Sequence, residues 1–327
     1  MMLGVFAAGL DRAFIELGIR PTLPRLSIDR SLRRLAIAEQ KTQRDLPDAA
    51  LFCAPSEPLQ RADRVPQSVG CLREEWLSGP PLDVPIAQEW GYSAQSAHTV
   101  TSRWYVRNSP RPLAILVNGW LPLPRLEPKR LWPIERLDQA GFDVVLPPLP
   151  WNARATPGVL AVEFPGRDPC SNIIELARAA SELVRIVGWA REQGRQRIML
   201  CGTSLGAHLV ALFATLPEAR GVDRLVLEKP LSFLSDPIRW HARGESTWCQ
   251  HVADRLERVY RVVSPLDRKP AVDPDRIRVI GGTLDQVTPI AAAQAVADHF
   301  QVPLQTIRAS HLFDPDRSRR LLRLLAD

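Results

Sequence analysis

The sequence is poor in cysteine and has no long uncharged apolar run. The five cysteines are odd in number and show no CxxC spacing, which disfavours a disulfide framework or a zinc site and favours free thiols in a reducing cytoplasm. No segment approaches the roughly 18 apolar residues of a membrane span, and the apolar start of the chain lacks the basic residues of a signal peptide. We therefore expect a cytoplasmic protein with no membrane span. The cysteines are Cys53, Cys71, Cys170, Cys201 and Cys249.

The excess of basic over acidic residues is small as well. The 42 basic and 36 acidic side chains leave a formal net charge of only +6 over 327 residues. Aromatic residues are not interleaved with basic runs, so we expect no nucleic-acid partner. The sequence contains no phosphate-binding loop, no GxGxxG motif and no cluster of metal-ligating residues, so we expect neither a cofactor nor a metal. It gives no indication of the oligomeric state.

What is present is the composition of an ordinary globular protein, with 45% hydrophobic and 24% charged residues. A chain of this length buries about 75% of its unfolded surface, which is enough for a core without a disulfide or a metal. Residues 1–98 show two short helical patterns and then a Pro-rich, irregular stretch over Leu46–Pro85. We expect them to form an N-terminal extension wrapped over a core of residues 99–327, and the sequence does not indicate what the extension does.

The beginning of this extension predicts an amphipathic helix, because apolar residues recur there at steps of three and four. We expect the helix to pack on the body of the protein. Peripheral contact of its apolar face with a membrane surface, or with a partner, is the alternative that stays open. The residues of this predicted face are Leu3, Phe6, Leu10, Phe14 and Leu17.

From about residue 99, short apolar strands alternate with helical patterns. This alternation predicts an α/β fold, in which right-handed crossovers build a mostly parallel sheet with helices on both faces. Ligands bind such sheets beyond the carboxyl ends of the strands. The expected strands are 99–106, 113–118, 143–146, 197–201, 224–227, 277–280 and 304–307, and the expected helices are 129–140, 172–193, 205–215, 291–300 and 317–325.

One motif in this region carries chemistry. The segment GTSLG (202–206) lies between an apolar strand and a helix rich in Ala and Leu, which is the context of a nucleophile elbow. Glycines are needed on either side of the serine because a Cβ there would clash at the sharp turn. The turn exposes the Ser204 hydroxyl and points N–H groups of the helix N-terminus at incoming negative charge. We predict that Ser204 is a nucleophile; the alternative is a tight glycine-rich turn with an incidental serine.

A serine hydroxyl needs a general base and a carboxylate that orients the base. Of six histidines, His311 follows an expected strand after a short turn and is predicted as the base. Asp285 follows the expected strand 277–280 in the same way and is predicted as the acid, with a local turn cap near Thr288 as the alternative role. Glu228, at the end of strand 224–227, is the second candidate acid.

The negative charge that forms on the substrate oxygen also needs donors. One is expected to be the backbone N–H of Leu205, directly after the nucleophile. The second is expected from the turn after strand 113–118, and we predict that it is the backbone N–H of Trp120, whose ring can also form a pocket wall. The loop after strand 143–146 contains Trp151 and Arg154, which we predict to bind substrate; loop packing and a solvated surface charge are the alternatives for this pair.

In these motifs, the sequence of residues 99–327 resembles the α/β-hydrolase family. The resemblance rests on GTSLG, on the chain order Ser204, Asp285, His311 and on the Asn118-Gly119-Trp120 turn, where many members have His-Gly. It implies an eight-stranded, mostly parallel sheet, a helical cap at about 231–270 between the sixth and seventh strands, and cofactor-free hydrolysis or acyl transfer.

We therefore predict a serine hydrolase of the carboxylesterase, lipase or thioesterase type that cleaves a small-molecule acyl ester or thioester through an acyl-enzyme on Ser204. An acyltransferase with the same triad is one alternative, because it shares the acyl-enzyme. A non-catalytic binding protein on the same fold is the other.

Overall fold

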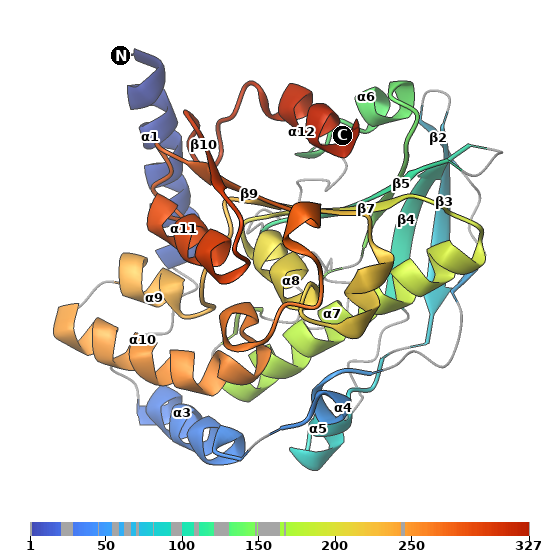
Figure 1. Ribbon diagram of the computed structural model, residues 1–327. Helices are drawn as coiled ribbons and strands as arrows, with labels where there is room; N and C mark the ends of the chain where they lie inside the picture. Colours follow the sequence, from blue (N-terminus) through green and yellow to red (C-terminus); the bar gives the residue numbers. More distant parts are fainter. Residues whose placement is uncertain are drawn as a thin grey trace.

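The computed structural model describes residues 2–20, 29–44, 46–53, 59–61, 67–69, 72–80, 82–92, 100–107, 111–120, 131–147, 149, 164–166, 168–242 and 246–326. Its centre is a twisted sheet whose strands run in the order β1-β3-β4-β6-β5-β7-β8-β9-β10, with β2 paired to β3 (Figure 1). The strands are β1 (Gln60–Arg61), β2 (Gln67–Val69), β3 (Leu72–Gly79), β4 (Val100–Val106), β5 (Leu113–Val117), β6 (Asp143–Leu146), β7 (Ile198–Thr203), β8 (Arg224–Glu228), β9 (Ile277–Gly282) and β10 (Leu304–Ile307).

The sheet is parallel from β6 to β10, and β4 and β3 continue it antiparallel. The predicted α/β class is therefore confirmed, with ten strands in the described part of the chain where eight were expected. The two shortest, β1 and β2, pair only with β3. Because six strands in succession run parallel, their carboxyl ends meet at one edge of the sheet.

Three strands, β1, β2 and β3, lie in the stretch predicted to be irregular, and β3 is the longest of them. Residues 72–79 form β3 and pair with β4 along seven residues. Only four β3 residues are buried, Leu72, Glu74, Leu77 and Gly79, and with Glu74 among them the strand lacks a clear apolar repeat. The sheet thus crosses the predicted boundary at residue 98, and the extension and the core share one sheet.

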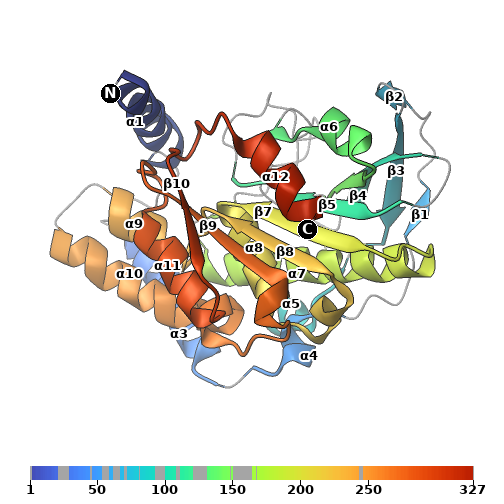
Figure 2. The same ribbon diagram turned by 45° about the horizontal axis from the view of Figure 1, so that its top comes forward.

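The buried residues of each parallel strand alternate between two apolar layers, as a sheet covered on both faces requires. In β5, Leu113, Ile115 and Val117 face the larger layer, while Ala114 and Leu116 face the smaller one. Helices α7, α8 and α11 pack in the larger layer, and α6 and α12 cover the opposite face (Figure 2). These helices are α6 (Ile134–Gln139), α7 (Pro169–Glu192), α8 (Leu205–Phe213), α11 (Ile290–His299) and α12 (Arg317–Ala326).

The segment between β8 and β9 is helical, as predicted for 231–270. It contains α9 (Asp236–His241), α10 (Ser246–Tyr260) and three short 3₁₀ turns, η6 (Arg261–Val263), η7 (Pro265–Asp267) and η8 (Pro274–Arg276). Helix α10 packs against α7 and against α3, a helix of the N-terminal part. The remaining helices are α1 (Met2–Phe14), η1 (Ile15–Ile19), α3 (Asp29–Thr42), α4 (Asp48–Leu51), α5 (Pro85–Glu89) and η5 (Pro217–Gly221).

The N-terminal helix exists, but part of the predicted face is exposed. Phe6 and Leu17 of that face are exposed, at 57% and 82%, whereas Phe14 is half-buried and packs against Trp120 and His311. The helix therefore packs on the body of the protein, as expected, through Phe14 together with Ala7, Asp11 and Ile15, which the predicted face did not include. It lies beside β10 and α11 (Figure 1). Among the described helices, none is both long and apolar enough to cross a membrane.

Candidate active site

Ser204 occupies the turn between β7 and α8, with φ 55° and ψ −124°, a backbone conformation that costs a non-glycine residue about 1–3 kcal/mol. Both flanking glycines are required by close packing. A Cβ on Gly202 would lie 2.8 Å from the Cα of Ala207, and one on Gly206 would lie 2.8 Å from the carbonyl carbon of Asn118. The predicted strand–turn–helix at GTSLG is confirmed, and the strain is imposed by its surroundings.

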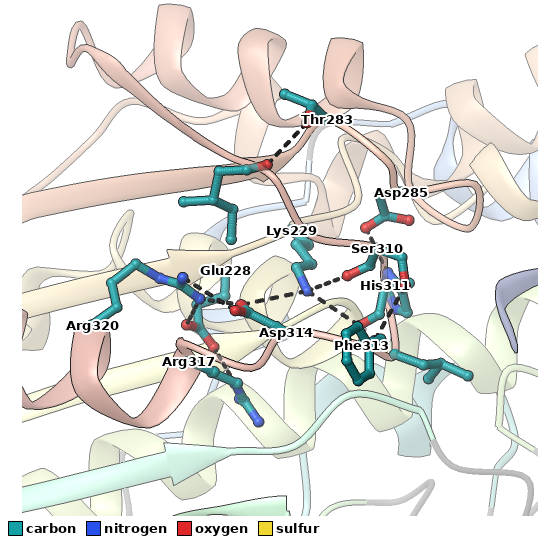
Figure 3. A network of polar contacts seen from close by, with 12 residues as sticks. Glu228, Lys229, Thr283, Asp285, Ser310, His311, Phe313, Asp314, Arg317 and Arg320 are labelled. Carbon is teal, nitrogen blue, oxygen red and sulfur yellow. Dashed lines mark hydrogen bonds and ion pairs between the residues drawn. The ribbon is translucent and has the colours of Figure 1, made fainter. Parts of the chain in front are cut away.

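Asp285 and His311 meet beyond the ends of β9 and β10 (Figure 3). The Nδ1 atom of His311 lies 2.8 Å from Oδ2 of Asp285. The other carboxylate oxygen, Oδ1, accepts the backbone N–H groups of Val287 and Thr288, both at 2.8 Å. The Thr288 hydroxyl lies 2.9 Å from Oδ2 and 3.2 Å from His311 Nδ1. Asp285 therefore caps its own turn, as the alternative prediction had it, and binds His311 as well.

The charge state of Asp285 follows from these contacts. Burial by itself raises the pKa of this carboxyl, but the positive charge and hydrogen bond of His311, the N–H of Thr288 and the nearby Lys229 ammonium lower it, and the net direction is downward. An ionised Asp285 accepts the Nδ1–H of His311, which leaves Nε2 as the unprotonated nitrogen of the neutral ring.

Ser204 opens into a mainly apolar cavity of about 60 Å³ next to this pair. Thr288 lines the cavity and contacts the His311 ring, and Phe14 lines it and stacks on that ring with centroids 6.3 Å apart. Within the described residues no hydrogen bond joins Ser204 Oγ to His311; in serine hydrolases this bond often tightens only in the substrate complex. The cavity is lined by Phe14, Ile19, Trp120, Pro165, Ser204, Leu205, Leu231, Leu234, Pro237, His241, Val287 and Thr288.

The turn Asn118-Gly119-Trp120 lies against the serine. A Cβ on Gly119 would be 3.0 Å from Ser204 Cβ and 3.7 Å from its Oγ. The buried Asn118 side chain accepts the indole N–H of Trp132 at 2.5 Å, and the Trp120 indole donates to the carbonyl of Phe164 at 3.1 Å, so both ends of the turn are fixed. The Trp120 ring is a cavity wall, as expected. The backbone N–H groups of Trp120 and Leu205, the two predicted oxyanion donors, have no hydrogen-bond acceptor among the described residues.

Glu228 is directed away from His311. Its carboxylate is buried and pairs with Arg317 at 2.8 Å and Arg320 at 3.6 Å (Figure 3). The neighbouring Lys229 has φ 50° and donates its ammonium to the carbonyls of Ser310, at 2.5 Å, and His311, at 3.2 Å. Glu228 is therefore structural, and Lys229 holds the turn that carries His311.

The two predicted substrate-binding residues, Trp151 and Arg154, lie outside the described residues. In the cap segment, Leu234 lines the cavity, whereas Trp248 is 38% exposed. His208 is fully buried in α8, with its Nδ1 3.2 Å from the carbonyl of Leu231.

Sequence reasoning missed what the N-terminal helix brings to this site. Phe14 and Ile19 line the cavity, and Asp11, fully buried, accepts hydrogen bonds from the segments around Asp285 and His311. Phe14 and Ile19 face the same way because η1 is a π-helix, closed by an i→i+5 bond from Arg20 N–H to the Ile15 carbonyl, so residues five apart share a face. The available signal was Asp11, a lone carboxylate within an apolar segment.

Comparison with known proteins places the fold. No family model matches the chain. Two curated relatives of Mycobacterium tuberculosis, the uncharacterized proteins MT2702 (strain CDC 1551 / Oshkosh) and Rv2627c (strain H37Rv), are 27% identical over 214 residues, which cover 62% of this chain and 49% of each relative. The chain thus spans about half the length of these relatives.

Solved structures resemble the chain more completely. Acetyl xylan esterase 1 from Thermoanaerobacterium sp. JW/SL YS485 has a TM-score of 0.56 at 11% identity, covering 91% of this chain and 93% of that one. The acetyl xylan esterase of Paenibacillus sp. R4 has a TM-score of 0.55 at 12% identity, covering 94% and 98%. Brefeldin A esterase has a TM-score of 0.50 at 14% identity, covering 95% and 87%. The chain has the α/β-hydrolase fold.

Proposed function

We propose that this α/β-hydrolase-fold chain is a serine hydrolase that cleaves a carboxylic ester or thioester through an acyl-enzyme on Ser204. The observation that carries the proposal is the strained Ser204, which lines a cavity together with Thr288 and Phe14, the two residues that contact His311 of the Asp285–His311 pair. Serine in such a backbone conformation persists only where its surroundings impose it, and strain of this kind clusters at active sites.

In the proposed mechanism, His311 Nε2 takes the proton of the Ser204 hydroxyl while Oγ attacks the substrate carbonyl carbon. Asp285 keeps Nδ1 protonated and stabilises the imidazolium that forms. The proton then passes to the leaving alcohol or thiol, and the acyl-enzyme is hydrolysed by a water that His311 deprotonates. The oxyanion of both tetrahedral intermediates is bound by the backbone N–H groups of Leu205 and Trp120, whose turns pack against each other beside Ser204.

The cavity supports a short acyl group. Its volume of about 60 Å³ is far below the roughly 300–1,000 Å³ of pockets for drug-sized ligands. The walls are apolar side chains, among them Ile19, Leu231 and Leu234. We propose acyl chains of about two to four carbons; two of the structural neighbours are named as acetyl xylan esterases.

The direct test uses an active-site label and a substrate panel. A fluorophosphonate is expected to label the wild type and Ser264→Ala, a buried serine away from the cavity, but not Ser204→Ala. p-Nitrophenyl esters and thioesters of graded chain length then report the preferred acyl group, and an added alcohol acceptor separates hydrolysis from acyl transfer. Equal labelling of wild type and Ser204→Ala would remove Ser204 from the role.

A further inference from the structure

The buried carboxylate of Asp11 is a second conspicuous group near the proposed site. Asp11 lies on α1, is fully buried, and accepts four hydrogen bonds within the described residues. One oxygen, Oδ2, accepts the backbone N–H of Gln286 at 3.1 Å and of His311 at 2.9 Å. The other, Oδ1, accepts the Ser310 hydroxyl at 3.0 Å and the backbone N–H of Leu312 at 3.1 Å. Three amides and one hydroxyl therefore replace the water that an exposed carboxylate would bind.

These partners belong to two separate catalytic loops. Gln286 directly follows Asp285, and the other three are His311 and its two neighbours. A single carboxylate thus joins the loop of the proposed acid to the loop of the proposed base. Each pair is 275 or more residues apart in the chain.

The loop that carries His311 needs such support because it has no regular structure. Strand β10 ends at Ile307, and His311 lies four residues beyond it. Lys229 holds the carbonyls of Ser310 and His311 from the side of β8, while Asp11 holds the N–H groups from the side of α1. The positive Lys229 ammonium binds carbonyl groups of this loop, and the negative Asp11 carboxylate binds its N–H groups. Two charge-assisted sets of hydrogen bonds therefore hold the backbone at His311 from opposite sides.

We propose that Asp11 is a positioning residue of the active site, which sets the imidazole of His311 against Asp285 and Ser204 by ordering both loops. It acts through backbone groups and does not contact the substrate. The proposal rests on the proposed function, and it gives α1 a role beyond packing, since the helix supplies a part of the site that the core alone lacks.

The test compares Asp11→Asn with a matched variant, Asp143→Asn. Asp143 is also fully buried and also accepts a backbone N–H, from Arg107 at 3.2 Å, but it lies at the amino end of β6, away from the site. Asparagine at position 11 presents an NH₂ group to two of the four donors. With the amide in place of Oδ2, the Gln286 and His311 N–H groups lose their acceptor, and with the amide in place of Oδ1, the Leu312 N–H group loses its acceptor. We expect kcat on a p-nitrophenyl ester to fall about 10- to 100-fold, as misplacement by about 1 Å can cause, with KM within about three-fold of the wild type. Asp143→Asn is expected to lose stability but keep kcat within about two-fold.

A second readout needs no turnover. The Nδ1–H of His311 that bonds Asp285 should give a low-field proton resonance, identified by its loss in Asp285→Asn, and Asp11→Asn should shift or broaden it while Asp143→Asn leaves it in place. If Asp11→Asn does not fold, Ser310→Ala removes a single donor from Oδ1 and should give a smaller loss of kcat with the same spectral change.

The outcomes separate the two proposals. An unshifted resonance and a kcat within two-fold in Asp11→Asn would reduce Asp11 to a fold anchor, as would a rise in KM at constant kcat. A wild type with no esterase activity and no phosphonate labelling, but with a resonance that Asp11→Asn shifts, would overturn the proposed function and leave the positioning of His311 intact.

Discussion

The helix η1 lines the cavity that we propose binds the acyl group, so shortening one of its side chains should change which esters the protein prefers. Ile19 is 7% exposed and lines the cavity beside Ser204. Ile19→Ala removes three carbons from this wall, and the space becomes available to two or three further methylenes of the substrate. Leu17, on the same helix but 82% exposed, offers the matched control Leu17→Ala.

The magnitude follows from the hydrophobic effect. Each buried methylene contributes about 0.8 kcal/mol, which is about a four-fold factor in kcat/KM. Two or three methylenes should therefore raise the ratio of kcat/KM for hexanoyl over acetyl ester by about 15- to 60-fold in Ile19→Ala. The wild type should prefer short acyl chains, in the range from acetyl to butyryl, over hexanoyl. The truncation should also cost about 2 kcal/mol of stability, the lower end for a buried isoleucine, because Ile19 lies at the rim of the core.

The assay is the initial rate with p-nitrophenyl acetate, butyrate and hexanoate for wild type, Ile19→Ala and Leu17→Ala. A shift toward longer chains confined to Ile19→Ala supports the assignment of the cavity to the acyl group. An unchanged chain-length profile in Ile19→Ala, or the same shift in Leu17→Ala, would refute it.

Three further predictions concern the triad, the oxyanion turn and pH. Asp285→Asn should lower kcat by about four orders of magnitude without unfolding the protein, and a larger loss in Glu228→Gln would reassign the acid. Gly119→Ala should lower kcat/KM at least ten-fold, because its methyl would lie 3.0 Å from Ser204 Cβ; full activity with a normal crystal structure would contradict this. Burial lowers the pKa of His208 to about 4, against about 6.5 in the unfolded chain. Between these two values the unfolded state binds one more proton than the folded state. The free energy of unfolding should therefore fall by up to about 3 kcal/mol as the pH drops from 6.5 to 4. Urea unfolding at pH 7 and pH 4.5 measures this loss, and His208→Gln should reduce it; an equal loss in both proteins would exclude His208 as the cause.

Elements with a local cause could be predicted from the amino-acid sequence. Strands 277–280 and 304–307 and the turn at Ser204 were predicted correctly because apolar periodicity and glycine sterics act over a few residues. The edge of the sheet where Asn118, Asp285 and His311 gather followed from the alternation of strands and helices. The positions of Asp285 and His311 directly after two expected strands indicated which acid and which histidine to pair.

The contacts that hold those residues in place depend on the folded chain. Asp11 meets Gln286 and His311 across 275 and 300 positions, and Lys229 reaches past the adjacent Glu228 to the carbonyls of Ser310 and His311, more than 80 positions away. Strand β3 exists because β4 pairs with it, since its own residues carry no clear apolar repeat. The phase of α1 was likewise set by the surface it covers. Long-range hydrogen bonds and strand pairing leave no periodic mark on either partner, which is why such contacts are visible only once the chain has folded.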